Sequence, residues 1–132
     1  LDGFEADLRD CPDLLPILAV VGARARGRTR LRGVEHARLK ESDRISVMAR
    51  ELRRVGVRVT ERRDGLEIEG GDGIRARTLD PGGDHRVAMA LSVLSLVAEG
   101  PSRVLNAGVV ADSYPGFFSD LFYLGGRLEV IS

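Results

Sequence analysis

Two segments of the chain are apolar on nearly every side of a helix, and this feature most restricts the folds open to it. Leucine, isoleucine, valine and alanine leave almost no polar stripe in Leu14–Ala25, and the same holds for Arg86–Ala98. A helix without a polar face is normally buried. The simplest architecture therefore places these two helices inside the domain, with strands and more polar helices around them.

The two apolar segments belong to a repeated pattern. Asp13–Gly27 lines up with His85–Gly100 at an offset of about 72 residues, as expected of a duplicated supersecondary unit. Residue periodicity predicts βαβαββ for residues 1–70 and βαβαβ for residues 71–132. The expected strands cover residues 5–10, 28–34, 57–61, 66–69, 74–79, 103–106 and 127–131, and the expected helices cover residues 14–25, 42–55, 86–98 and 115–124. The predicted fold class is α/β (α+β), made of βαβαββ units with buried parallel helices; a conventional doubly wound sheet is the alternative.

Composition narrows the classes of partner. The 132 residues suffice for one domain with a core, and 20 basic against 20 acidic residues give a formal net charge of zero. Such a neutral chain gives no reason to expect nucleic acid as the main partner. No apolar run reaches the ~18 residues that a membrane span needs. The single cysteine, Cys11, excludes a disulfide within the chain and favours a reducing compartment such as the cytoplasm; we interpret it as a small buried residue.

Lys40 is the only lysine, since the other 19 basic residues are arginines. An ammonium is a compact charge whose pKa shifts readily, whereas a guanidinium is a fixed, permanently charged fork. Lys40 is therefore either a residue whose task arginine cannot perform or a product of chance.

Polar side chains concentrate where the expected helices begin. Helix N-termini attract anions, and Lys40, Arg44 and Arg86 would add positive charge for a carboxylate or phosphate. Nearby acids could transfer protons. The structural alternative is that Asp10, Asp43 and Asp84 cap helices and that the Lys40–Arg44 segment is a solvated helix face. The residues concerned are Asp10, Asp13, His36, Lys40, Glu41, Asp43, Arg44, Asp84, His85, Arg86, Asp112, Ser113 and Tyr114.

Four segments, in this order, resemble signatures of the EPSP synthase family. Pro12-Asp13 precedes an apolar helix, and residues 38–44 read Arg-Leu-Lys-Glu-Ser-Asp-Arg. Residues 84–90 read Asp-His-Arg-Val-Ala-Met-Ala, and residues 114–118 read Tyr-Pro-Gly-Phe-Phe. Together they cover nearly the whole chain, which makes the set far more specific than any one of them.

The resemblance implies a fold and a place within it. Family members have two domains of βαβαββ units with buried helices, an inverse α/β-barrel-like arrangement. Residues 1–132 would be the C-terminal part of one enolpyruvyl transferase domain, with repeat units about 1–70 and 71–132. The partner domain would lie outside this chain, so the isolated chain is expected to be inactive, and the intact enzyme is expected to be a cytoplasmic monomer.

The resemblance also implies a reaction and roles for particular residues. The family transfers the enolpyruvyl group of phosphoenolpyruvate to the 5-hydroxyl of shikimate 3-phosphate, releasing phosphate, without a metal or organic cofactor. By resemblance, Asp13, Lys40 and Glu41 would be catalytic: Asp13 as base toward the hydroxyl, Lys40 as proton shuttle, and Glu41 as the acid and base at the methylene carbon. Substrate binding would fall to Asp13, His36, Lys40, Arg44, His85 and Arg86, the two arginines holding the carboxylate of phosphoenolpyruvate. The herbicide glyphosate, which mimics that substrate, is expected to inhibit the intact enzyme.

Two departures from the family pattern leave alternatives open. Many members carry a lysine just before the Tyr-Pro segment, where this chain has Ala111, Asp112 and Ser113, and His36 stands where some members have asparagine.

The rival enzymes are UDP-N-acetylglucosamine enolpyruvyl transferase and the RNA 3′-phosphate cyclase group. A folded but non-catalytic fragment is the third alternative.

Overall fold

The computed structural model describes residues 2–40, 42–71, 73–75, 77–98, 102–105 and 128–131. Within them, the first part of the chain follows the predicted order of strands and helices, although the bounds differ by a few residues. The elements are β1 (Glu5–Asp7), η1 (Pro12–Leu14), α1 (Leu15–Arg24), β2 (Gly27–Arg32), η2 (Glu35–Leu39), α2 (Arg44–Arg54), β3 (Arg58–Arg62), β4 (Gly65–Gly70), β5 (Thr78–Leu79), α3 (His85–Leu94), β6 (Ser102–Leu105) and β7 (Leu128–Ile131), where η1 and η2 are 3-10 helices. The predicted helix over residues 115–124 lies outside the described residues.

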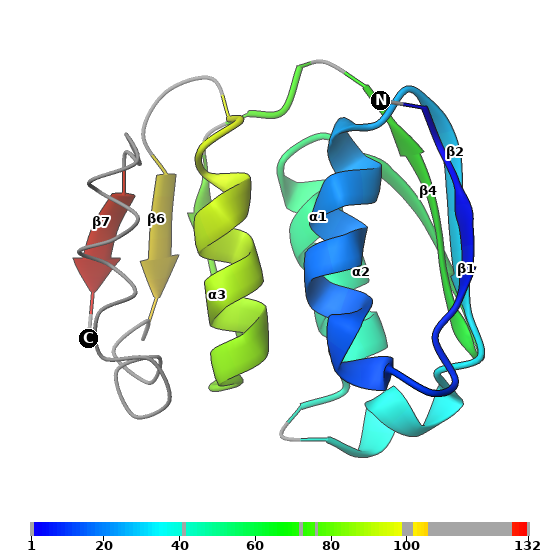
Figure 1. Ribbon diagram of the computed structural model, residues 1–132. Coiled ribbons are helices and arrows are strands. Elements are labelled where there is room, and N and C mark those ends of the chain that lie inside the picture. Colours follow the sequence, from blue (N-terminus) through cyan, green and yellow to red (C-terminus); the bar gives the residue numbers. More distant parts are fainter. Residues whose placement is uncertain are drawn as a thin grey trace.

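The described strands form two sheets, and the helices lie between them (Figure 1). One sheet has the order β1-β2-β4-β3, and the other is a parallel sheet with the order β5-β6-β7. The three α-helices run in the same direction in Figure 1, so that their N-termini lie at one end of the molecule. The described strands thus do not form the single doubly wound sheet that was the alternative.

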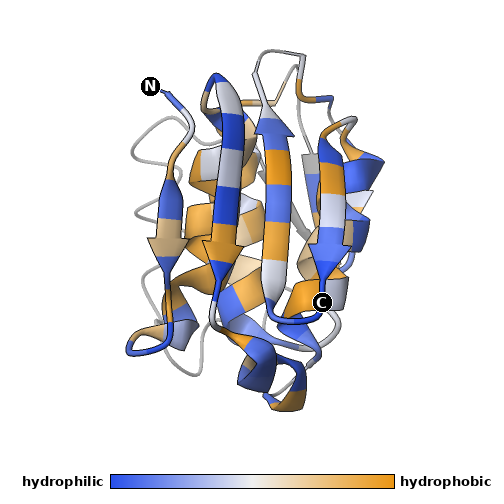
Figure 2. Cartoon of the chain, turned by 90° about the vertical axis from the view of Figure 1, so that its right-hand side faces the viewer, coloured by the Kyte–Doolittle hydropathy of each residue, from blue (hydrophilic) through white to orange (hydrophobic). Residues whose placement is uncertain are grey.

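The four-stranded sheet has one buried and one wet face. Along β2, Thr29 and Leu31 are buried while Arg28 and Arg30 are exposed, and the same alternation is visible on the strands that face the viewer in Figure 2. Arginine and glutamate pair across strands on the wet face, for example Arg28 Nη2 to Glu69 Oε1 at 3.5 Å. Strands whose residues alternate between a buried face and a solvent-exposed face are typical of antiparallel sheets.

The hydrophobic core fills the space between this sheet and the helices. Its fully buried members include residues of all three α-helices and of the sheet strands β2 and β4: Leu15, Leu31, Ile45, Met48, Leu52, Leu66, Ile68 and Leu91. No helix of the described residues has the length and apolar character to cross a membrane.

Three predicted elements are shorter in the structure. The strand expected over residues 5–10 ends at Asp7, because Leu8 and Cys11 close a turn through the bond from Cys11 N to Leu8 O. Of the strand expected over residues 74–79, only Thr78–Leu79 pairs with β6. Helix α3 ends at Leu94 and continues as tighter turns to Val97, whose amide donates to Leu94 O.

The prediction of a buried Cys11 is wrong. Cys11 is exposed because it precedes the first residue of η1, outside the part of the chain that packs on the core.

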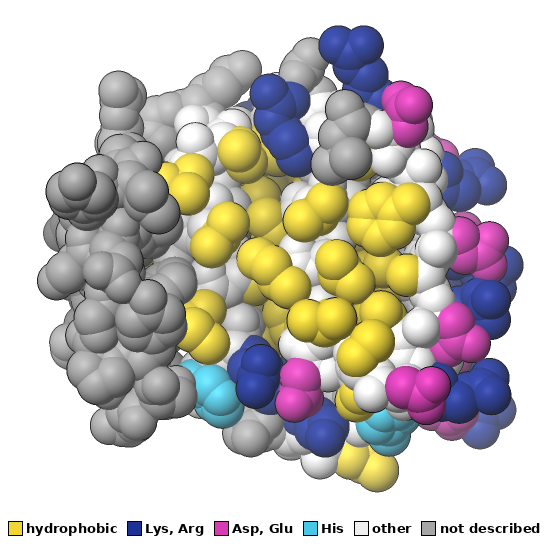
Figure 3. All heavy atoms as spheres, viewed as in Figure 1, with side chains coloured by type: hydrophobic (Ala, Val, Ile, Leu, Met, Phe, Trp, Pro, Cys, Tyr) yellow, Lys and Arg dark blue, Asp and Glu magenta, His cyan; other side chains and the backbone are white. Residues whose placement is uncertain are grey.

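The two apolar helices are less enclosed than their composition predicts. Leu14 is 43% exposed, and Ile17, Leu18 and Val21 of the same face are half-buried. Hydrophobic side chains gather over α1 and α3 on the face seen in Figure 3, with charged side chains at its lower margin. We call this surface, formed by the outer sides of α1 and α3, the open apolar face.

Candidate functional site

The N-termini of the three α-helices meet through one arginine. Arg44 is the first residue of α2. Its guanidinium contacts Asp13, which lies in η1 just before α1, and Asp84, which is the N-cap of α3. The structure therefore brings these three side chains together at the starts of the helices.

The pair of Arg44 with Asp84 is almost completely removed from water. Arg44 Nε lies 2.8 Å from Asp84 Oδ2, and Nη2 lies 3.3 Å from Oδ1. The side chains are 2% and 0% exposed. This two-point contact fixes the plane of the guanidinium.

Asp84 is also a helix cap. Its Oδ1 accepts from the amides of Arg86 at 3.0 Å and Val87 at 3.5 Å, and its Oδ2 accepts from the Ser42 hydroxyl at 2.8 Å. Burial opposes ionisation, but the hydrogen bonds from Arg44 and Ser42, together with the charge of Arg44, outweigh it and lower the pKa of Asp84. Asp84 therefore stays ionised and holds Arg44 in place. The predicted capping role is confirmed for it, as it is for Asp43, whose Oδ1 accepts from Ser46 N at 3.1 Å.

Asp13 lies at the boundary between the buried pair and solvent. Its Oδ1 is 2.9 Å from Arg44 Nη1, and its Oδ2 is 3.7 Å from Arg86 Nη2. Asp13 is 47% exposed and Arg86 is 44% exposed. One carboxylate thus bridges two arginines at a place that an incoming ligand can reach.

A groove leads from this bridge along the open apolar face. It has a volume of about 220 Å³ between α1 and α3, with Asp13 and Arg86 at one end. Its remaining lining is apolar: Leu14, Pro16, Ile17, Met89, Ala90 and Val93.

The other predicted site residues are placed less closely together. His36 and Lys40 are exposed and His85 is half-buried; none of the three has a described contact with Asp13 or Arg44. Glu41 lies outside the described residues, as do Ala111, Asp112, Ser113 and Tyr114. Among the residues that the structure describes, no three His, Cys, Asp or Glu side chains are grouped as a metal site would need.

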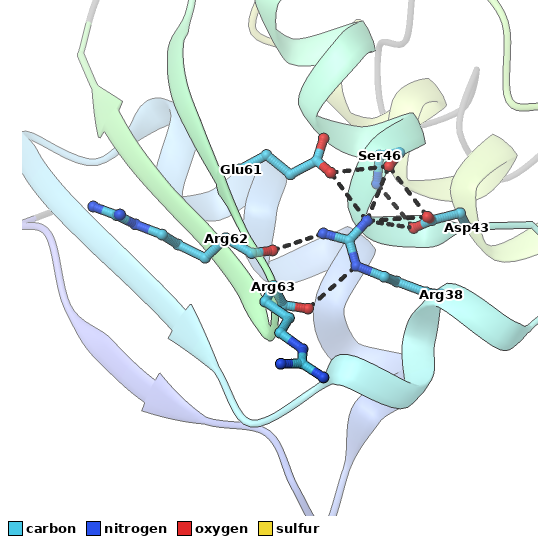
Figure 4. A network of polar contacts seen from close by, with 6 residues as sticks. All are labelled: Arg38, Asp43, Ser46, Glu61, Arg62 and Arg63. Atoms are coloured by element: carbon cyan, nitrogen blue, oxygen red, sulfur yellow. Dashed lines mark hydrogen bonds and ion pairs between the residues drawn. The ribbon is translucent and has the colours of Figure 1, made fainter.

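Two charged residues with several hydrogen bonds each, Glu51 and Arg38, were not among the predicted site residues. Glu51 of α2 is fully buried; its carboxylate accepts from Arg50 Nε at 2.9 Å and Arg54 Nε at 3.1 Å and from the amide of Asp80. Arg38, inside the recognised Arg38–Arg44 segment, joins η2 to α2 and to the β3–β4 turn (Figure 4). The available signal for Glu51 was an acidic residue among the apolar positions of α2. The available signal for Arg38 was its place inside the Arg38–Arg44 motif, where the resemblance gave it no role.

One known protein family matches most of the chain. The profile of the EPSP synthase (3-phosphoshikimate 1-carboxyvinyltransferase) family matches residues 1–121. The chain therefore belongs to the EPSP synthase family.

Individual relatives show how much of the family's length the chain represents. It is 48% identical over 130 residues to a 3-phosphoshikimate 1-carboxyvinyltransferase of Methanocella arvoryzae, covering 98% of this chain and 31% of that protein. It is 47% identical over 131 residues to the protein of the same description from Aeropyrum pernix, covering 99% and 30%. A solved EPSP synthase from Acinetobacter baumannii superposes with a TM-score of 0.87 at 34% identity, covering 97% of this chain and 31% of that one. The chain thus spans about 30% of the length of the relatives it matches.

Proposed function

We propose that this chain is part of an enzyme that transfers the enolpyruvyl group of phosphoenolpyruvate to the 5-hydroxyl of shikimate 3-phosphate. The observation that carries the proposal is the bridge of Asp13 between Arg44 and Arg86 at the meeting point of the helix N-termini. Arginines positioned near one another before a ligand arrives suit a planar carboxylate, because part of the cost of orienting them is met before the charge binds.

In the proposed reaction the hydroxyl oxygen bonds to the central carbon of phosphoenolpyruvate while a proton is added to its methylene carbon. The tetrahedral adduct then loses phosphate, and the methyl group returns a proton to restore the double bond. Two distinct groups are needed, since one proton leaves oxygen as another reaches carbon. We assign Asp13 as the base toward the hydroxyl, Glu41 as the acid and later base at carbon, and Lys40 as the shuttle between the two substrates.

The substrate carboxylate is assigned to Arg44 and Arg86. Arg86 is the accessible member, at 44% exposure, and its ion pair with Asp13, at 3.7 Å, is longer than a hydrogen bond. A ligand carboxylate can therefore take the position on Arg86 while Asp13 turns to the acceptor hydroxyl. His36 and His85 are assigned to the walls of the same site.

We further propose that residues 1–132 form two repeat units of one inverse α/β-barrel-like domain and that a partner domain belongs to the same longer protein. The chain's share of about 30% of its relatives' length supports this, and so does the open apolar face, since apolar patches of this kind mark surfaces that another part of a protein covers. Residues 1–132 alone are accordingly expected to have no measurable turnover. The intact enzyme is proposed to be a cytoplasmic monomer.

The test is phosphate release by a chimera in which residues 1–132 replace the matching segment of the Methanocella arvoryzae relative. Phosphoenolpyruvate is supplied with shikimate 3-phosphate or, separately, with UDP-N-acetylglucosamine. We expect release only with shikimate 3-phosphate, its loss in Lys40→Met, and normal release in the control Arg28→Met, whose side chain is 67% exposed and pairs with Glu69. Release with the nucleotide sugar instead would establish the rival transferase, and no release with either acceptor would refute the proposed activity.

A further inference from the structure

The guanidinium of Arg38 is bonded through all three of its nitrogens. Nη1 donates to Asp43 Oδ2 at 3.0 Å, to Glu61 Oε2 at 3.0 Å and to Ser46 Oγ at 3.1 Å. Nη2 donates to the carbonyl of Arg62 at 2.7 Å and Nε to that of Arg63 at 3.2 Å. Figure 4 shows the guanidinium between the start of α2 and the β3–β4 turn. Arg38 therefore ties two separate elements to η2.

Further bonds hold the chain before Arg38 on the same turn. The amide of Val34 donates to the carbonyl of Asp64 at 2.9 Å, and the amide of Gly33 donates to Asp64 Oδ2 at 3.2 Å. At the outer edge, Arg63 Nε lies 2.9 Å from Glu35 Oε1. Both ends of η2 are thus bonded to the hairpin turn, through Glu35 and Arg38, and its last residue directly precedes Lys40.

The chain after Lys40 is held from the other side. Asp43 caps α2 and also forms an ion pair with Arg38. The Arg38–Asp43 pair therefore joins the residues on either side of Lys40. Ser42 and Arg44 are bonded to Asp84 of α3. Lys40 is therefore an exposed residue on a short loop with both ends anchored.

We propose that Arg38 is a positioning residue for Lys40: its clamp on Asp43, Glu61 and the β3–β4 turn holds the loop that presents the ammonium to the substrates. The proposal rests on the function proposed above, because it assigns Lys40 to the chemistry. In this proposal Arg38 acts through the loop and not on a reacting atom.

Arginine is required here because of the number of acceptors and their charge. The carboxylate oxygens of Asp43 and Glu61 each lie 3.0 Å from the same Nη1, so without Arg38 two negative charges would face each other. Burial would lower the pKa of Arg38, but its hydrogen bonds to Asp43 and Glu61 and their charges raise it instead. A lysine can keep the charge between the two acids, but not the contacts of Nε and Nη2 with the turn carbonyls.

The matched control is Arg53, which also ties α2 to the hairpin. Arg53 donates from Nε at 3.1 Å and Nη2 at 2.9 Å to the carbonyl of Val59, far along the chain from Lys40. A merely structural role for Arg38 predicts the same behaviour for Arg38→Met and Arg53→Met.

The experiment compares Arg38→Met, Arg38→Lys and Arg53→Met in the chimera described above. We expect Arg38→Met to lower kcat about 100-fold, the loss that misplacement of a catalytic group by about 1 Å can cause, with KM for both substrates changed by less than about threefold. Arg38→Lys is expected to fall between Arg38→Met and the parent, and Arg53→Met to keep the parent's kcat.

Hydrogen exchange gives a readout that does not depend on activity. We expect faster amide exchange in residues 35–44 of Arg38→Met and an unchanged rate there in Arg53→Met, since local opening follows the loss of local bonds. Unchanged exchange in Arg38→Met would overturn the clamp, and faster exchange with an unchanged kcat would overturn its role in positioning Lys40. If the parent chimera is inactive, the proposed function fails and the positioning role fails with it, while the exchange data still decide whether the clamp exists.

Discussion

Replacing Arg44 by methionine removes the cation of a buried ion pair, and we expect a large loss of stability. Arg44 contacts Asp84 at two points, and the two side chains are 2% and 0% exposed. Methionine keeps an unbranched, adaptable stem, so most of the packing is preserved. The variant therefore leaves the buried Asp84 carboxylate without its cation, and it also removes the contact with the half-exposed Asp13.

The magnitude follows from that burial. Breaking a buried ion pair by removing one partner costs about 3–5 kcal/mol in free energy of unfolding. Asp84 keeps its bonds to Ser42 and to the amide of Arg86, which places the expectation for Arg44→Met at the lower end, about 3 kcal/mol. Asp84→Asn keeps a side chain that can cap α3 and leaves Arg44 beside Asp13, so about 2 kcal/mol is expected, near the value of one charged hydrogen bond.

The double variant tests the origin of the cost. When both charges are removed, neither is left buried and unpaired, so the loss should be smaller than the sum of the single losses by about 1–3 kcal/mol. Urea unfolding of the 132-residue chain, followed by circular dichroism because the sequence has no tryptophan, measures all three variants. Arg63→Met is the control: its pair with Glu35 is exposed at 86% and 58%, and such pairs contribute less than about 1 kcal/mol.

Two results would refute this reasoning. If Arg44→Met costs no more than the exposed control, the pair is not the desolvated contact that its burial indicates. If the single losses simply add in the double variant, Arg44 and Asp84 do not stabilise each other, and the cost must come from packing alone.

Three further changes have definite expected outcomes. The pKa of Asp84 in the folded chain lies below its value of about 3.9 in the unfolded chain. The ionised carboxylate therefore contributes stability above the unfolded pKa, and this contribution is lost as the pH falls through the folded pKa. In urea titrations, the difference in free energy of unfolding between the parent and Asp84→Asn should narrow below about pH 4. Glu51→Ala should lower the free energy of unfolding by about 1–3 kcal/mol because it leaves the Asp80 amide without its acceptor, and Glu51→Gln, which keeps an acceptor, should lower it by less; equal losses would count against the assigned bond. Gly70→Ala should cost about 1–3 kcal/mol, since the added Cβ would meet the carbonyls of Gly22, Ala23 and Ala25, and an unchanged urea midpoint would show that α1 can move away from β4.

Most of the local structure could be predicted because it depends on short-range pattern. Two neighbouring strands were expected over residues 57–61 and 66–69, and β3 and β4 form there as a hairpin, with Arg62 and Gly65 as the last pair. The caps by Asp43 and Asp84 were expected from residue type and position alone. Errors fell at element ends, where a bond such as Cys11 N to Leu8 O, rather than propensity, decides the boundary.

The site was predicted less completely than the fold. Residue type and motif pointed to Asp13, Arg44 and Arg86, and the structure joins these three through ion pairs. The burial of Arg44 was not predicted, because α2 has a wet face in sequence and only the packing of α3 against it places Asp84 beside the guanidinium. For the same reason no role was predicted for Arg38, because its acceptors on the β3–β4 turn lie near it only in the folded chain.

By itself, the sequence determined the family, the apolar character of α1 and α3, and the residue types available at the helix starts. Only the tertiary structure decided which charges face each other: Arg44 meets Asp84 across 40 positions of chain, and Arg38 meets Glu61 across 23. Hydrophobic pattern is a property of neighbouring residues and can be read along the chain, whereas an ion pair depends on distances of about 3–4 Å that exist only after distant segments have packed together.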